Sequence, residues 1–495
     1  MGSSKKVVSG VAWSIIVNVV NAIYGFISVP ILIRYFGKAE YGLIGLATSV
    51  NVYIQLMDLG FSSTNVRFFS VWLTKGLKEK VKKLFQTSLA FYGTIGIINA
   101  LILLVVLAFS NSIFNVTPEQ DQILKSLLAV LTVAAILNWV SSCFDQLVSA
   151  TENVAWIKRR ALIPKLLMIA ILFGTVYFKL SILTYFILST VSTFIELPLT
   201  INKIRKEAPY VSFLPKLDKE TFKEILPYCL NIFSFGLFQF SFFNLRPVFL
   251  GIQGTPEAVA DYRVLNGIAS LVTMVGGVFM GALLPSSSKI VAQGNKDAYY
   301  RIAYQGTKYV SILYCFCSFG LMAIGSDLMT LYVGESYLYL LPWLNAWLFF
   351  TLGGHNKCIS SLILSGADIR AITYMSAFSS IFGLVVCWFT IPSCQVGGTV
   401  IGLGVYIVCQ ALFFYTYYWP RKMGINSLRV LTNSFGPYVL LGAACYYLCK
   451  YLPHLSNHWG NVVYLGIVFS VVFLTVSYFT TDKEDKSFFM SLLKR

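Results

Sequence analysis

A series of long apolar segments constrains this chain more than any other feature. Fourteen of them follow one another, separated by short polar stretches that often hold Gly or Pro, near 11–33, 41–62, 84–108, 123–144, 162–179, 182–201, 226–250, 264–285, 308–332, 341–365, 371–391, 397–418, 433–450 and 460–480. A helix that crosses a bilayer needs about 20 mostly apolar residues, whereas the strands of a membrane barrel are roughly ten residues long and alternate in polarity. The segments therefore predict an all-α polytopic membrane protein with 14 transmembrane helices.

Charge supports this class and sets the orientation. Only 12% of the 495 residues are charged, about half the usual soluble share, which excludes a soluble enzyme, a nucleic-acid-binding domain and a disordered scaffold. With 14 spans, thirty of the 38 Lys and Arg residues fall on one side, at the N-terminus, in 63–83, 145–165, 202–225, 286–308, at 370, in 419–432 and at the C-terminus. Cytoplasmic loops are rich in Lys and Arg, so both termini are expected in the cytoplasm, and the net charge of +17 requires no nucleic acid.

Motifs for covalent chemistry are missing from the sequence. It has no paired acids, nucleophile motif or Walker-type phosphate loop, and its ten cysteines lack zinc-ligand spacing. We therefore expect no enzyme activity, no catalytic residue, no cofactor and no metal site.

Internal repetition predicts two similar halves. Three pairs of short strings recur in order at offsets between 214 and 218 residues: Ser149–Glu152 with Ser365–Asp368, Gly76–Glu79 with Gly294–Asp297, and Leu32–Gly37 with Arg246–Gly251. Six predicted helices fit within this offset, so both halves have the same orientation, as in transporters built from parallel repeats. We expect an N-lobe at 1–205 with helices 1–6, a C-lobe at 206–423 with helices 7–12, and helices 13–14 with a cytoplasmic tail at 424–495.

The stretch Pro30–Gly42, followed by Asp58, Gly60 and Arg67, resembles the opening of the lipid-linked oligosaccharide flippases. These are the O-antigen and polysaccharide transporters of the multidrug/oligosaccharidyl-lipid/polysaccharide exporter superfamily. The resemblance implies two six-helix bundles around a central cavity. It also implies a flippase that moves an undecaprenyl-diphosphate-linked oligosaccharide repeat unit by alternating access, from the inner to the outer leaflet of the bacterial inner membrane. The implied pathway is O-antigen, capsular or exopolysaccharide synthesis, with membrane lipids and polysaccharide polymerase machinery as partners.

Cations inside the apolar segments are candidates for binding such an anionic cargo. Arginine donates paired hydrogen bonds to phosphate, and a charge in the bilayer core is costly unless it has a function. Arg246 lies inside segment 226–250 and Lys357 inside 341–365, beside His355. Arg34 and Arg67 match the family pattern. The alternative roles are snorkelling to the interface for Arg246 and Lys357, and interfacial anchoring for Arg34 and Arg67.

Three acids in or near the ends of apolar segments are candidates for ion coupling. Asp58, Glu196 and Asp327 can hold a proton, bind Na⁺ through hard oxygen ligands, or pair with a cation. Helix capping and solvation are the alternative roles. Asp58 can also pair with Arg67. Coupling to H⁺ or Na⁺ is therefore a hypothesis.

Other transporter and enzyme classes give alternative readings of the same helices. A multidrug or toxin cation antiporter of the same superfamily would have the same lobes but should prefer acidic cavity residues. A membrane polymerase or ligase would need a sizeable outer loop with catalytic Arg or His, whereas the longest outer stretch, about 109–122, has no His. A 12-helix permease would require two segments not to span, which reporter fusions at 395 and 456 can test.

Overall fold

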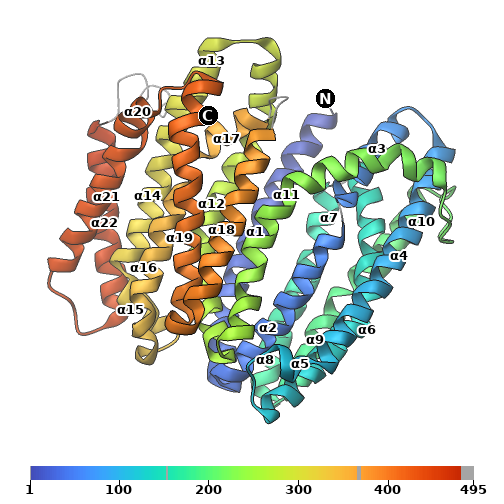
Figure 1. Cartoon of the computed structure of the whole chain (residues 1–495), viewed down its shortest axis with the longest axis horizontal. Coiled ribbons are helices and arrows are strands. Elements are labelled where there is room, and N and C mark those ends of the chain that lie inside the picture. Colours follow the sequence, from blue (N-terminus) through green and yellow to red (C-terminus); the bar gives the residue numbers. More distant parts are fainter. Residues whose placement is uncertain (1, 59, 152–153, 365–369, 481–495) are drawn as a thin grey trace. The chain divides into compact units, whose positions relative to one another are not determined.

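The computed structural model describes residues 2–58, 60–151, 154–364 and 370–480, and every element in these ranges is helical (Figure 1). The chain divides into two compact units. Unit 1 is Met1–Arg263 with Ile391–Thr399, and unit 2 is Val264–Thr390 with Val400–Arg495. The lobe boundaries expected from the sequence repeat stay predictions. Glu152 and Asp368, which belong to that repeat, lie outside the described residues.

Elements labelled η are 3₁₀ or π turns. The elements that begin in unit 1 are α1 (Gly2–Phe36), α2 (Lys38–Ile54), η1 (Gln55–Asp58), α3 (Phe61–Thr74), α4 (Lys78–Ala108), α5 (Ser110–Ile113), α6 (Pro118–Ala150), α7 (Val154–Arg160), α8 (Leu162–Tyr177), α9 (Ile182–Thr193), α10 (Glu196–Glu207), α11 (Lys219–Gln253), α12 (Pro256–Gln293) and α19 (Val396–Phe413). Those that begin in unit 2 are α13 (Lys296–Arg301), η2 (Ile302–Gly306), α14 (Thr307–Ala323), α15 (Gly325–Tyr332), η3 (Glu335–Leu340), α16 (Leu341–Thr351), η4 (Leu352–Asn356), α17 (Lys357–Leu364), α18 (Arg370–Cys394), η5 (Phe414–Met423), α20 (Ser427–Arg429), η6 (Val430–Phe435), α21 (Gly436–Tyr451) and α22 (His458–Thr480).

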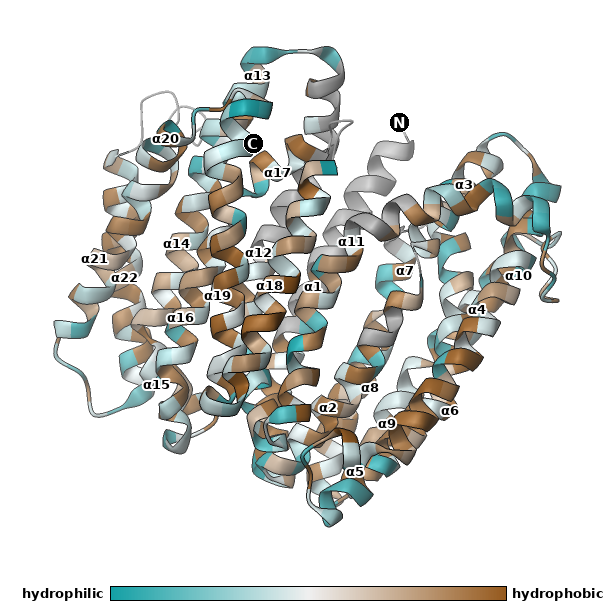
Figure 2. Cartoon of the chain, in the orientation of Figure 1, coloured by the Kyte–Doolittle hydropathy of each residue, from teal (hydrophilic) through white to brown (hydrophobic). Residues whose placement is uncertain are grey.

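Length and apolar surface identify membrane-spanning helices. Within the described residues, seven helices are long and apolar enough to cross a membrane, and two bent pairs raise the number to nine. Large apolar side chains on these helices face outward, as at Val133 of α6 and Phe389 of α18, which are 79% and 75% exposed. Figure 2 shows that much of the ribbon of α4 and α6 is coloured as hydrophobic. The chain is a multi-pass membrane protein; the total of 14 spans and the side of the termini stay predictions.

The segment expected to be one span at 41–62 is broken. Its first part ends with η1 at Asp58, α3 begins at Phe61, and the two parts meet at 45°. Gly60 has a φ of 75°, a left-handed conformation that costs other residues roughly 1–2 kcal/mol. The segment 308–332 is likewise bent, by 67° between α14 and α15. The first break places Asp58 at an interruption within a span.

Helix α6 begins with a strong local signal. Thr117 and Gln120 form a reciprocal capping box and Pro118 occupies the first turn, which satisfies orphan N–H groups and presets the backbone. The helix packs closely on α4, because a Cβ at Gly96 would lie only 2.9 Å from the Cα of Ile136. Small residues allow such close helix approach in membranes. Helix α6 thereby becomes part of the core of unit 1.

Aromatic side chains complete that core around α3, α4 and α6. The rings of Phe61 and Phe91 stack with centroids 3.9 Å apart, and Tyr92 stacks on Trp139 at 5.8 Å. In unit 2, α14 packs on α21, α22 and η4. A Cβ at Gly354 would lie 2.3 Å from the ring of Tyr314, so glycine is required where η4 meets α14.

Candidate functional site

Helix α6 carries two adjacent polar residues, Asp145 and Gln146, in its last two turns. Successive residues of an α-helix point about 100° apart, so the two side chains face different neighbours. Asp145 contacts α7, whereas Gln146 contacts α3 and α4. Two polar networks result, both inside unit 1.

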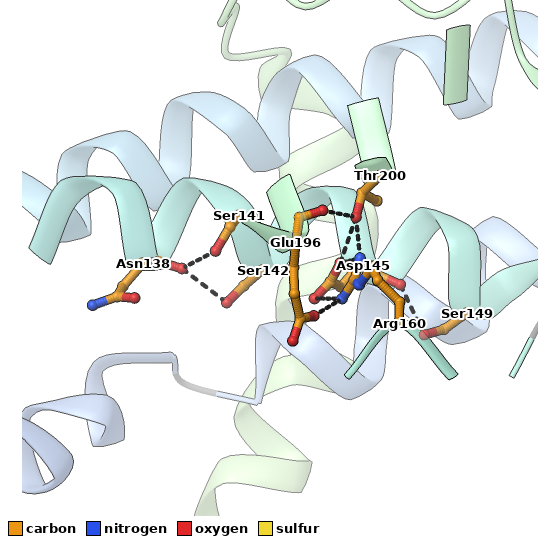
Figure 3. A network of polar contacts seen from close by, with 8 residues as sticks. All are labelled: Asn138, Ser141, Ser142, Asp145, Ser149, Arg160, Glu196 and Thr200. Atoms are coloured by element: carbon orange, nitrogen blue, oxygen red, sulfur yellow. Dashed lines mark hydrogen bonds and ion pairs between the residues drawn. The ribbon is translucent and has the colours of Figure 1, made fainter. Parts of the chain in front are cut away.

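The first network surrounds Arg160, the last residue of α7, which is 4% exposed (Figure 3). Its two Nη atoms donate to the two carboxylate oxygens of Asp145 over 2.7 and 3.0 Å. Nη2 also pairs with Glu196, and Nη1 contacts the hydroxyl of Thr200. The Thr200 hydroxyl in turn donates to the backbone oxygen of Glu196 over 2.9 Å. One guanidinium therefore joins α6, α7 and α10.

This pairing makes burial of the Arg160 charge tolerable. Bidentate arginine–carboxylate contacts are strong and geometrically specific. Removing one member of a buried pair typically costs about 3–5 kcal/mol, since the other charge is left uncompensated. Glu196 was expected from the sequence as an ion-coupling residue. Its carboxylate lies in this network with a side chain that is 22% exposed, and its coupling role stays a prediction.

The second network holds Asp58. Its carboxylate accepts hydrogen bonds from the backbone N–H and hydroxyl of Ser62, over 3.1 and 2.9 Å, and from the hydroxyl of Tyr92 over 2.8 Å. The amide of Gln146 donates to the hydroxyls of Ser62 and Tyr92 and accepts from Asn65. No cation pairs with Asp58 within the described ranges. The Asp58 carboxylate at the helix break is thus held by neutral donors. A proton or a cation that binds this carboxylate would change its hydrogen bonds to Ser62 and Tyr92.

Asp58 and Arg67, which the sequence allows to pair, form no ion pair within the described residues. The Arg67 guanidinium carbon instead lies 4.1 Å from the ring centre of Tyr228. Arg67 follows Ser62 by five residues, which turns its side chain about 140° around α3 from the side that contacts Asp58. Arg34 is exposed in the last turn of α1 and has no hydrogen bond or ion pair within the described residues. Cargo binding by Arg34 and Arg67 stays a prediction.

Arg246 of α11 is buried inside unit 1, with 2% exposure. Its guanidinium carbon lies 5.1 Å from the ring centre of Phe242 and 5.6 Å from that of Tyr262, distances typical of cation–π contacts. Nη1 donates to the backbone oxygen of Thr399 over 3.4 Å. The charge therefore lies among aromatic rings and does not face acyl chains.

His355 and Lys357 lie in unit 2, where η4 passes into α17. His355 is 4% exposed, its ring stacks on Phe435 with centroids 3.9 Å apart, and both ring nitrogens are hydrogen-bonded, Nδ1 to the backbone oxygen of Leu352 and Nε2 to the Tyr415 hydroxyl. Lys357 is half-buried and has no hydrogen bond or ion pair in the part of the chain that the structure describes. The ammonium of Lys357 thus has no hydrogen-bond partner among the described residues, whereas both ring nitrogens of His355 are hydrogen-bonded.

Asp327 of α15 is buried, and its side chain contacts residues at the start of α22. Its Oδ1 contacts Nδ1 of His458 over 2.7 Å and accepts from the Asn461 amide over 3.2 Å, and its Oδ2 lies 4.0 Å from His454. Although one acid and two histidines meet here, no group of three or more His, Cys, Asp or Glu in the described residues is placed to hold a metal ion. The contacts connect α15 with α22, and an ion-coupling role for Asp327 stays a prediction.

Sequence reasoning missed Asp145 and Arg160. The apolar segment 123–144 stops one residue before Asp145, so both were assigned to the polar stretch 145–165. Helix α6 in fact continues to Ala150. The run Gln146–Ala150 contains no Gly or Pro. The absence of these helix-breaking residues is the sequence signal that the helix continues past Asp145.

Comparisons with known proteins agree with this architecture. No curated protein sequence matches the chain. The fold resembles that of the lipid II flippase MurJ in an inward closed conformation, with a TM-score of 0.73 at 12% identity over 94% of this chain and 98% of that chain. It also resembles an inward-facing multidrug resistance MATE family transporter of the MOP superfamily, with a TM-score of 0.61 at 14% identity over 88% and 96% of the two chains.

A third similar structure is a MOP superfamily transporter from Pyrococcus furiosus, with a TM-score of 0.52 at 13% identity over 91% of this chain and 97% of that chain. These likenesses establish the fold. A family model described as polysaccharide biosynthesis protein matches residues 7–291, more than half of the chain. The fold of the chain is thus like those of MurJ and of the MATE transporter, and the chain belongs to the polysaccharide biosynthesis protein family.

Proposed function

We propose that this protein is a flippase that moves an undecaprenyl-diphosphate-linked oligosaccharide repeat unit from the inner to the outer leaflet of the bacterial inner membrane. The product serves O-antigen, capsule or exopolysaccharide synthesis, next to the polysaccharide polymerase machinery. The family match over residues 7–291 carries this proposal, and the MurJ-like fold supports it. The cargo moves by alternating access without covalent chemistry.

The buried cations suit an anionic cargo. A diphosphate that leaves water needs donors that replace its hydration, and arginine and lysine supply charge-assisted hydrogen bonds. Arg246 in unit 1 is buried among aromatic rings, and Lys357 in unit 2 is not committed to another side chain of the described residues. We assign both to cargo binding.

Reconstitution tests the proposal. Full-length protein in proteoliposomes should move a fluorescent undecaprenyl-diphosphate oligosaccharide to the leaflet where an impermeant reductant can reach the dye. Arg246→Ala and Lys357→Ala should each slow this step at least tenfold while the protein stays folded. Lys450→Ala, an exposed cation at the end of α21, is the matched control. If the wild type does not move the lipid-linked oligosaccharide, the flippase proposal is wrong. Normal rates in both variants would contradict the assignment of Arg246 and Lys357 to cargo binding.

Exchange of small organic cations is the second candidate, favoured by the likeness to the MATE transporter. The same proteoliposomes loaded with ethidium should then release the dye when a proton or Na⁺ gradient is imposed. Dye release without movement of the lipid-linked sugar would select the antiporter. Collapse of both gradients tests whether transport is coupled to an ion, the role that we propose for Asp58, Asp327 or Glu196.

A further inference from the structure

A basic cavity of about 510 Å³ lies on unit 1, and neither Arg246 nor Lys357 is among its lining residues. Residues of α7 and α10 line it, with one residue from α8. Its polar lining includes four cations and one acid: Arg159, Arg160, Lys203, Lys206 and Glu207. The concentration of positive charge in one hollow indicates an anionic ligand.

The cavity lies at the level of a membrane interface. One spanning stretch begins at Trp156 and another ends at Glu207, and residues from both ends line the hollow. Exposed apolar side chains follow along the same helices toward the bilayer core: Ile163, Leu166 and Leu199 are 39%, 60% and 40% exposed. A ligand here would meet cations at its head and apolar surface below it, as a membrane lipid does.

The pairing of the lining charges shows which of them can bind a ligand. Arg160 is compensated by Asp145 and Glu196, and Lys203 bonds to Glu207 over 2.7 Å. Arg159 and Lys206 are exposed and have no acidic partner within the described ranges. The buried Nε of Arg160 has no hydrogen-bond partner there either. The two exposed cations, Arg159 and Lys206, are thus available to an anion.

We propose that this cavity binds the phosphate group of an anionic membrane lipid. Arg159 and Lys206 contact the phosphate oxygens, and the acyl chains run over Ile163, Leu166 and Leu199. Basic pockets between transmembrane helices are known to take phospholipid head groups in this way. The site is separate from the proposed cargo cations and does not depend on the flippase proposal.

Native mass spectrometry of the full-length protein tests the site. Phosphatidylglycerol should bind the wild type at least tenfold more tightly than phosphatidylcholine, because only the former has a net negative head group. The double variant R159Q/K206Q should lose at least tenfold in phosphatidylglycerol affinity. The control K216Q/K219Q removes two exposed cations outside the cavity and should bind like the wild type. Circular dichroism and thermal unfolding confirm that both variants fold.

Three results would overturn the proposal: equal affinity for both lipids, equal loss in the two double variants, or no loss in R159Q/K206Q. Inorganic phosphate distinguishes a lipid from a free anion. It should displace phosphatidylglycerol only weakly, since it lacks the acyl chains that contact the apolar surface. Displacement by phosphate at the affinity of the lipid would overturn the lipid assignment.

Discussion

Arg160 is a buried cation of unit 1 that two acidic side chains share. Its guanidinium contacts Asp145, Glu196 and Thr200 from two other helices. Arg160→Ala leaves two carboxylates without their shared counter-charge, but their side chains are 40% and 22% exposed and water reaches them. We therefore expect a loss of about 1.5–3 kcal/mol in the free energy of unfolding. Unfolding of the purified protein in mixed micelles measures this loss.

The neighbouring Arg159 gives a matched control. It is exposed and has no acidic partner in the described residues, and its guanidinium carbon lies 4.8 Å from the ring centre of Trp13. Arg159→Ala should therefore cost no more than about 1 kcal/mol. If Arg160→Ala and Arg159→Ala unfold alike, the Arg160 network does not hold α6, α7 and α10 together.

Gly60 is the residue that permits the break between η1 and α3. Gly60→Ala forces a Cβ into a backbone with φ of 75°, which should cost roughly 1–2 kcal/mol. Gly93→Ala, inside α4 with nothing within 4 Å of the added carbon, should instead stabilise by about 0.5–1 kcal/mol. Equal stability of the two variants would show that the left-handed turn is not required.

At the scale of elements, α11 begins with a side-chain cap. Asp218 Oδ1 accepts a hydrogen bond from the backbone N–H of Thr221 over 2.9 Å, and the Asp218 carboxylate lies 3.5 Å from Lys83. The bonds to Thr221, and then Lys83, lower the pKa of Asp218. Asp218→Ala should cost about 0.5–2 kcal/mol at neutral pH.

The pH dependence of this difference follows from the direction of the shift. Because the folded-state pKa lies below the unfolded one, near 3.9, the stabilisation is fully present above the unfolded value and disappears as pH falls through the folded value. Unfolding curves of wild type and Asp218→Ala should therefore converge in acid. Asp218→Asn keeps a neutral cap that does not titrate. The difference in free energy of unfolding between Asp218→Asn and Asp218→Ala should therefore not change with pH. A gap that persists unchanged at the lowest pH would refute the charge contribution.

Sequence patterns located the apolar helices well and the polar contacts poorly. The stretches 84–108 and 123–144 fall inside α4 and α6, because apolar length alone determines them. The break at Gly60 depends on one backbone angle, and His355 bonds to Tyr415, 60 residues away. Such contacts form only when distant helices pack, so a single sequence gives no local signal for them.

At the scale of the whole molecule, the number of spans is the open architectural prediction. With 14 helices and a cytoplasmic N-terminus, reporters fused at 395 and 456 should both be outside the cytoplasm, because an odd number of predicted spans precedes each position. Alkaline phosphatase fusions should be active at both positions and green fluorescent protein fusions dark. A fluorescent fusion at either position would place that position in the cytoplasm. This result would favour the 12-helix permease topology or another number of spans over the 14-helix topology.

The adjacent side chains Asp145 and Gln146 restrict how unit 1 can move. Each is held by hydrogen bonds to a different neighbour, α7 for one and α3 with α4 for the other. Turning α6 about its own axis would break both sets of bonds together. Any rearrangement of this unit during a working cycle should therefore carry α3, α4, α6 and α7 as one rigid block, together with Asp58, which bonds to Ser62 and Tyr92 across the break at Gly60.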